Sequence, residues 1–246
     1  MAVIAVYSVK GGVGKTTIAA NLAWCSAAIS KRQTLLWDLD AAGGAGFLFG
    51  IDPPKRKPAL SIFSQTKSVD ELAWASGVDN LDILPADESL RGLDSLLVSI
   101  GKRKRLAKLA ATLSREYDRI VLDCPPVLNE LSAQAIRASD IIIVPLPPSP
   151  LAFRALDTIV SNLQSSFKNH PPILPVLSMV DMRRTIHREA REAAPDWPVI
   201  PMASVVEQMA ARREPLGCFA PRSPANQAFA RLWAAIEKKL AKNSKG

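Results

Sequence analysis

The stretch Lys10-Gly11-Gly12-Val13-Gly14-Lys15-Thr16 decides the fold of this 246-residue chain. It follows the apolar run at 2–7 directly and precedes a segment of helical composition at 17–23. Glycines let backbone N–H groups turn inward around a polyphosphate, and the positive end of the following helix faces the same anion. This order of strand, loop and helix predicts a phosphate-binding loop. A glycine-rich turn without chemical function is the alternative.

Two side chains of the loop have roles that follow from their chemistry. Lys15 is expected to reach the β- and γ-phosphates of a nucleotide, and the Thr16 hydroxyl is expected to bind Mg²⁺. The usual pattern has a glycine five residues before Gly14, but Val9 stands there, and a second lysine, Lys10, opens the loop. The candidate nucleotide-binding residues of the loop are Lys10, Gly11, Gly12, Val13, Gly14, Lys15, Thr16 and Thr17.

The sequence KGGVGKTT resembles the deviant P-loop of the ParA/MinD ATPases, and the chain most resembles a short ParA-type partition or positioning ATPase. The resemblance implies an ATP-dependent homodimer that encloses two nucleotides. Lys10 would contact the phosphates bound to the partner protomer, as a catalytic cation supplied in trans. The alternative is that Lys10 only adds positive potential at the mouth of its own loop.

Short apolar runs recur along the chain, with amphipathic segments between most of them. They predict an α/β fold with a doubly wound, mostly parallel sheet and helices on both faces. The resemblance implies the same architecture, that of the SIMIBI class of P-loop NTPases. A single domain is expected over 1–241, followed by a frayed polar tail at 242–246. The runs lie at 2–7, 34–37, 81–84, 119–122, 140–146 and 173–180.

The net charge and the cysteine content limit the possible functions of the protein. The net charge of +8 favours polyanion partners through sequence-independent attraction. The three cysteines, Cys25, Cys124 and Cys218, form no CxxC pair and are expected to be buried, with no zinc site or disulfide. No apolar stretch reaches the roughly 20 residues that span a bilayer, and no signal peptide is recognised, so a cytoplasmic protein is expected.

Two of the predicted strands end in acids. Asp38 and Asp40 close one strand, and Asp123 closes another, followed by Cys124 and a proline pair. Carboxylates at these positions can hold a metal's water shell and orient an attacking water. Acids at a solvent-exposed turn are the alternative, and a catalytic cysteine at 124 has no histidine near it in sequence.

The resemblance assigns roles to these acids. It implies that Asp40 activates water and is catalytic together with Lys10 and Lys15, and that Thr16, Asp38 and Asp123 form the metal set. The prolines at 125–126 would stiffen a loop that senses the γ-phosphate. Ala41-Ala42 stand where the family has Pro-Gln.

The resemblance also implies a binding region for adenine near 177–185, where the sequence is similar to the family's strand-end motif. Asp181, Arg183 and Pro201 are the candidate base-binding residues. Met202 replaces the arginine that usually follows Ile-Pro, so base selectivity is the least specified part of the site.

A ParA-type protein would bind nucleoid DNA non-specifically as the ATP-bound dimer and leave it when a partner protein stimulates hydrolysis. It would thereby position a plasmid, a chromosome region or a protein cargo. Two basic groups are the DNA-binding candidates, with an ordinary solvated helix face as the alternative. A contiguous basic run at 102–105, with Lys108, is a weaker candidate. The two groups are Arg184, Arg188 and Arg191, at helical spacing, and Arg212, Arg213 and Arg222.

Other functions remain open on the same fold. A MinD-like membrane-cycling ATPase would use the amphipathic segment at 229–240 as an anchor, although packing of that helix on the sheet is expected instead. An iron–sulfur carrier would need paired cysteines, which are not seen in this sequence. A regulator of polysaccharide synthesis or of flagellar placement is not separated by these motifs.

Overall fold

The computed structural model describes residues 1–52, 58–64, 69, 71–100, 104–166 and 170–243. Within them, eight strands form one sheet in the order β3-β4-β2-β5-β1-β6-β7-β8. Only the β3–β4 pair is antiparallel in this described sheet. The strands are β1 Ala2–Val6, β2 Thr34–Asp38, β3 Trp74–Ala75, β4 Leu81–Leu84, β5 Arg119–Asp123, β6 Ile141–Leu146, β7 Ile173–Val180 and β8 Val199–Pro201.

The six apolar runs of the sequence correspond to six of these strands, so the predicted doubly wound sheet is confirmed. Strand β1 lies between β5 and β6, which places the glycine-rich loop at the middle of the sheet's carboxyl edge. The sequence analysis did not predict β3 and β8. They have only two and three residues, too few to be recognised as strands from the sequence.

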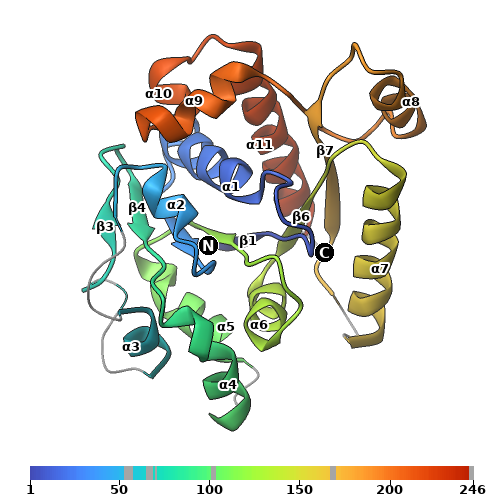
Figure 1. Cartoon of the computed structure of the whole chain (residues 1–246). Coiled ribbons are helices and arrows are strands. Elements are labelled where there is room, and N and C mark those ends of the chain that lie inside the picture. Colours follow the sequence, from blue (N-terminus) through green and yellow to red (C-terminus); the bar gives the residue numbers. More distant parts are fainter. Residues whose placement is uncertain (53–57, 65–68, 70, 101–103, 167–169, 244–246) are drawn as a thin grey trace.

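Helices cover both faces of the sheet (Figure 1). One apolar core contains side chains of α1, α9, α10 and α11, and the other contains side chains of α3 to α7. The helices are α1 Lys15–Trp24, α2 Gly44–Phe47, α3 Pro58–Ser64, α4 Leu90–Ile100, α5 Arg105–Thr112, α6 Glu130–Ala138, α7 Pro150–Ser166, α8 Thr185–Ala193, α9 Ser204–Arg212, α10 Leu216–Phe219 and α11 Pro224–Asn243, with a π-helical turn η1 at Cys25–Ile29 and a 3₁₀ turn η2 at Leu113–Arg115.

Helix α11 packs on the sheet, as expected. Its apolar stripe, which includes Phe229, Trp233 and Ile236, is buried in the core that also holds α1. That stripe is covered by the protein itself, so it is not the exposed face that a membrane anchor needs. No helix in the described part of the chain is both long and apolar enough to cross a bilayer. Of the predicted tail, residues 242 and 243 belong to α11, and 244–246 lie outside the described residues.

The expectation for the cysteines is confirmed for two of them and wrong for the third. Cys25 and Cys124 are buried, whereas Cys218 is exposed, and all three are free thiols. Cys218 lies on the short helix α10, where the neighbouring Gly217 takes the position against the core.

Gly217 should be intolerant of any side chain. A Cβ atom at this position would overlap the indole ring of Trp24, so α10 must shift to accept Gly217→Ala. We expect a loss of about 1–3 kcal/mol, as is typical of an overpacked core, measured by thermal or urea unfolding. The control is Gly92→Ala on α4, where a Cβ meets nothing within 4 Å. It should gain up to about 1 kcal/mol from helix propensity. Equal stability of Gly217→Ala and wild type would contradict this packing.

Candidate functional site

The loop between β1 and α1 has the conformation that its glycines predict. Gly12 and Gly14 have φ angles of 70° and 88°, in the left-handed region that favours glycine. Gly14 caps α1 by its backbone alone, because no side chain caps this end and the first turn of α1 holds no acid. The first N–H groups of α1 are therefore left for an anion.

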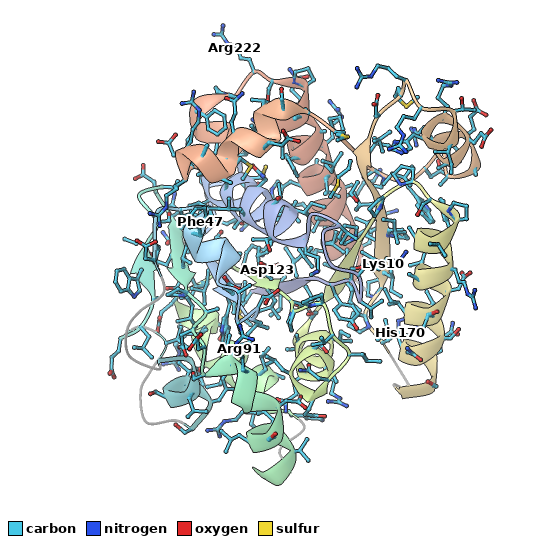
Figure 2. All side chains as sticks on the ribbon, viewed as in Figure 1. Lys10, Phe47, Arg91, Asp123, His170 and Arg222 are labelled. Carbon is cyan, nitrogen blue, oxygen red and sulfur yellow. The ribbon has the colours of Figure 1, made fainter. Side chains whose placement is uncertain are left out.

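Lys15 is folded back over the loop. Its Nζ donates to the Lys10 carbonyl oxygen at 3.1 Å, and the side chain is buried. Burial lowers the pKa of Lys15, while Asp123 and Asp40 nearby oppose that change. Lys10 is itself only half-buried, and Figure 2 shows it apart from Asp123.

The two strand-end acids lie side by side. Register pairs Asp38 of β2 with Asp123 of β5, and both carboxyls are buried. The Asp38 oxygens accept hydrogen bonds from the N–H groups of Asp40 (3.0 Å) and Ala45 (2.9 Å). Neither Asp123 oxygen has a hydrogen-bond partner of ordinary geometry among the described residues. Asp38 thus holds the backbone that follows β2, whereas Asp123 is left for another partner.

This arrangement resists the ionisation of both acids. Burial and the neighbouring charge of Asp123 raise the pKa of Asp38 well above its usual range. Burial also raises the pKa of Asp123 to about 7, although the Thr16 hydroxyl and the Lys15 ammonium favour its charged form. A cation at this position would relieve the cost of the charges.

The residues at this edge fit Mg²⁺. Asp123 offers unpartnered carboxylate oxygens close to the Thr16 hydroxyl, and hard cations prefer oxygen ligands. No group of three or more His, Cys, Asp or Glu that could hold a metal exists in the described part of the chain. Mg²⁺ in proteins is usually bound by one or two carboxylates, with phosphate oxygens and waters as its other ligands. Asp38, also predicted for the metal, has both oxygens engaged by backbone N–H groups.

Asp40 lies in the turn after β2 rather than in the strand. It is half-buried, and its Oδ1 accepts from the Ala42 N–H at 3.1 Å. The expectation that both acids close the strand is therefore correct only for Asp38, since β2 ends there. Asp40 nevertheless remains near Lys15, on whose pKa it acts.

Gly44 is a site residue that the sequence analysis missed. It begins α2, and a Cβ there would lie 3.1 Å from Cγ2 of Thr16, closer than ordinary contact. Gly43 before it has a φ of 68°. The signal was the glycine pair Gly43-Gly44, which follows Asp40 after Ala41-Ala42, in a region where no motif was recognised.

An apolar cavity of about 240 Å³ lies beside the loop. Pro201, a predicted base-binding residue, lines it together with Gly14, Met179 and Met202. Ser178 also lines the cavity, and its hydroxyl is buried and has no hydrogen-bond partner among the described residues. The position beside the phosphate loop and the apolar walls suit a nucleobase.

Two predicted base-binding residues lie elsewhere. Asp181 and Arg183 pair with each other through two contacts of 2.9 Å at the exposed end of β7, and neither is among the residues that line the cavity. The Asp181 N–H donates to Nδ1 of His187 on α8 at 2.9 Å.

Two of the three arginines of the first basic group are hydrogen-bonded within the protein. Arg184 precedes α8 and is exposed. Arg188 donates to the carbonyls of Met182 and Arg183 and to the Thr185 hydroxyl. Arg191 donates to three carbonyls that follow the helix, those of Ala194, Pro195 and Trp197.

The second basic group is also partly engaged. Arg213 pairs with Asp52 at 2.6 Å and lies over the Phe47 ring, and Arg212 lies over Phe219. Arg222 projects from the tip of the molecule (Figure 2). Among the described residues, the guanidinium groups of Arg184 and Arg222 have no hydrogen bond or ion pair.

The contiguous basic run is not a continuous exposed patch. Lys102 and Arg103 lie outside the described residues, while Lys104 and Lys108 are exposed. Arg105 is buried, and its Nε donates to the Phe63 carbonyl at 2.9 Å. Arg105 is thus a structural residue.

Sequence comparison identifies relatives over most of the chain. The AAA domain family AAA_31 matches residues 1–175. Sporulation initiation inhibitor protein Soj of Bacillus subtilis is 30% identical over 234 residues, which cover 90% of this chain and 92% of Soj. Chromosome partitioning protein ParA of Myxococcus xanthus is 33% identical over 196 residues, which cover 77% of this chain and 69% of that protein.

Solved structures share the fold. A McdA variant from Cyanothece in complex with ATP superimposes with a TM-score of 0.82 at 20% identity, over 96% of both chains. The septum site-determining protein MinD of Pyrococcus horikoshii, in complex with Mg-ADP, gives a TM-score of 0.78 at 23% identity, also over 96% of both chains.

The raised pKa of Asp123 makes the nucleotide-free protein sensitive to pH. The folded carboxyl keeps its proton up to about pH 7, whereas an unfolded aspartate ionises near its ordinary value of 3.8. This group therefore lowers stability as pH rises between those values, at about 1.4 kcal/mol per unit. We expect Asp123→Asn to raise the unfolding free energy, and by more at pH 8 than at pH 5, in urea titrations without nucleotide or Mg²⁺. A gain that does not change with pH would contradict the assignment.

Proposed function

The chain belongs to the ParA/MinD family of P-loop ATPases, and we propose that it is a ParA-type protein that dimerises on ATP, binds DNA non-specifically and positions a cargo. The cargo would be a plasmid, a chromosome region or a protein assembly. ATP and Mg²⁺ are its cofactors. We further propose that residues 1–241 form one ATPase domain and that the protein is cytoplasmic and associated with the nucleoid. Its hydrolysis of ATP would be slow and stimulated by a partner protein.

Lys10 carries the proposal of a dimer. The loop already contains one buried lysine, Lys15, directed inward at the Lys10 carbonyl. Lys10 stands at the loop's entrance beside Gly11 and Gly12, which are exposed. A cation in this position is suited to a second nucleotide, brought by a partner protomer, where it would stabilise the charge that develops during phosphoryl transfer.

The other residues supply binding and orientation. The N–H groups of the first turn of α1 and the Lys15 ammonium bind phosphate oxygens. Thr16 and Asp123 hold Mg²⁺, which supplies positive charge at the transferring phosphoryl group. Asp40, in the turn beside them, orients the attacking water. Because Lys10 must come from the partner, an isolated protomer lacks one of these charges and hydrolyses slowly.

Two arginines support the proposal of DNA binding. Arg184 and Arg222 have guanidinium groups without hydrogen bonds or ion pairs among the described residues, so they are available to phosphates. Arg184 follows the carboxyl end of β7, and Arg222 precedes α11. Phosphate contacts of this kind are non-specific and depend strongly on salt.

The membrane-cycling alternative has less support. Its candidate anchor, the apolar stripe of α11, is buried against the sheet. Liposome binding remains a direct test of this alternative and is measured beside DNA binding.

The central experiment measures binding to non-specific duplex DNA with ATP, with ADP, and with ATP for Lys10→Ala. We expect the wild type to bind DNA with ATP and not with ADP, strongly at low salt and much more weakly at moderate salt. We expect Lys10→Ala not to bind DNA with ATP, because its dimer does not form. Light scattering reports the dimer independently. ATP-dependent liposome binding without DNA binding would replace this proposal with the membrane-cycling one.

The arginine assignment has its own test. We expect Arg184→Ala combined with Arg222→Ala to weaken DNA binding and to reduce the slope of log affinity against log salt by about 2 per protomer, since each lost phosphate contact removes about one unit. ATP-dependent dimerisation should not change. The matched control is Arg115→Ala. Arg115 is an exposed arginine in η2, just before the amino-terminal end of β5. An equal loss in the control would show that only net charge matters.

A further inference from the structure

We propose that Asp94 is a positioning residue for ATP hydrolysis, because it fixes from α4 the loop that joins the metal-binding Asp123 to α6. The proposal rests on the family's ATPase activity and on the role proposed for Asp123. It assigns a function to a residue in a part of the chain where the sequence analysis found no site.

The contact joins a carboxylate to the start of another helix. Asp94 Oδ1 accepts from the N–H groups of Glu130 at 2.6 Å and Leu131 at 3.3 Å, which are the first two residues of α6. Backbone N–H groups at a helix start have no partner inside the helix, and a negative charge there is favoured by the helix dipole. Hydrogen bonds to an ionised group are also stronger than neutral ones.

The end of the loop, residues 127–129, is hydrogen-bonded to the first turn of α6. The Asn129 N–H donates to the Ser132 hydroxyl at 2.9 Å, and that hydroxyl donates to the Val127 carbonyl at 2.8 Å. Asn129 Oδ1 in turn accepts from the Ser132 N–H at 3.0 Å. Residues 127–129 therefore move with the first turn of α6, so whatever holds that turn also holds the loop.

The loop has few other attachments along its length. At its start, the Cys124 N–H donates to the Val6 carbonyl at 3.2 Å, next to Asp123 in β5. Further along, the side chains of Val127 and Leu128 are 46% and 54% exposed, so they contribute little packing. The loop is thus held mainly at its two ends, by β5 and by α6.

Helix α4, which carries Asp94, is itself held in place by packing in the core. Leu93 and Leu97 of α4 are buried in the same core as Leu131 and Ala135 of α6. Asp94 is half-buried between the two helices, where it adds a directional contact to the apolar packing. Packing alone holds the helices together, and the carboxylate sets the position of the α6 start.

Loss of the Asp94 contact should affect ATP and ADP differently. The loop before α1 offers the N–H groups of the first turn of α1 and the Lys15 ammonium to phosphates, and residues 124–129 are not part of that loop. The end of a triphosphate must lie nearer Asp123 and the loop after it. Loss of Asp94 should therefore affect ATP-dependent steps and leave ADP binding intact.

The test compares Asp94→Ala and Asp94→Asn with wild type. For Asp94→Ala we expect at least about tenfold slower hydrolysis, because small misplacements of a site cost that much. The dissociation constant for ADP should stay within about twofold, and kcat should fall more than KM rises. Asp94→Asn keeps an acceptor oxygen and should recover most of the rate. Amide hydrogen exchange at 126–131 should accelerate in Asp94→Ala.

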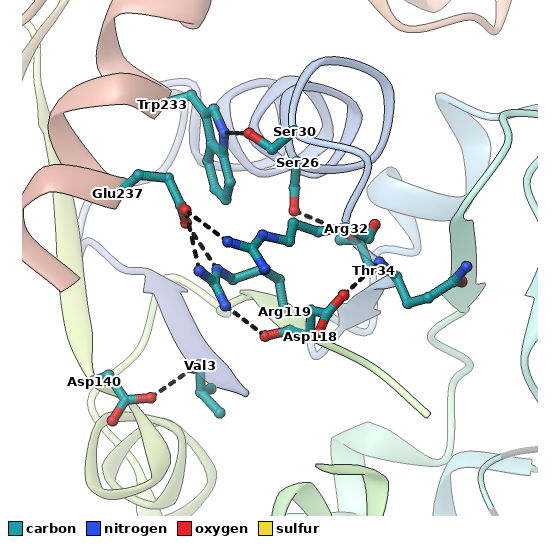
Figure 3. A network of polar contacts seen from close by, with 11 residues as sticks. Val3, Ser26, Ser30, Arg32, Thr34, Asp118, Arg119, Asp140, Trp233 and Glu237 are labelled. Atoms are coloured by element: carbon teal, nitrogen blue, oxygen red, sulfur yellow. Dashed lines mark hydrogen bonds and ion pairs between the residues drawn. The ribbon is translucent and has the colours of Figure 1, made fainter. Parts of the chain in front are cut away.

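The matched control lies at the opposite edge of the sheet. Asp140 Oδ2 accepts from the Val3 N–H at 2.7 Å, close to the network of Arg119 and Glu237 (Figure 3). Asp140→Ala removes a comparable carboxylate contact and should leave hydrolysis and exchange at 126–131 unchanged. Equal effects of Asp94→Ala and Asp140→Ala on both readouts would overturn the proposal. Absence of hydrolysis in wild type would contradict the ATPase activity instead, and amide exchange would still test the positioning.

Discussion

The burial of Asp38 beside Asp123 is the constraint on which the rest of the site depends. Parallel pairing of β2 with β5 brings the two carboxyls into register, out of water, at the edge where the phosphate loop begins. Asp38 is stabilised by two backbone N–H groups and thereby fixes the turn that leads to α2. That turn places Gly44 against Thr16. Asp123 has no such partner, which makes the edge receptive to a cation.

Much of the fold could be predicted from the sequence because its signals are local. Strands buried on both faces are continuous apolar runs, and the glycines of the loop follow from the φ angles that the turn requires. The acids at the ends of β2 and β5 could be found because each directly follows such an apolar run. Strands β3 and β8 have no such signal, since two or three residues pair only because a neighbour is already in place.

The positions of long polar side chains could not be predicted in the same way. Helical spacing made Arg191 a candidate for DNA binding, yet its guanidinium donates to carbonyls of the segment after α8, whose path is set by tertiary structure. Asp181 and Arg183 were read as facing the base, but in the structure they satisfy each other. Arg105 shows the same limit, because a residue in a basic run became a buried donor to α3. Such contacts depend on which carbonyl or carboxylate happens to be near, and spacing carries no information about that.

The central position of β1 also has a consequence for how the protein is made. Its partners are residues 119–123 and 141–143, so this strand has no neighbours until the chain has been synthesised as far as residue 119. Contacts between such distant segments form slowly, because a long loop must close before they are gained. The phosphate loop is continuous with β1, so it acquires its shape only when this pairing is complete. A nascent chain with the full KGGVGKTT sequence is therefore still unable to bind nucleotide, and binding reports that the sheet has been assembled.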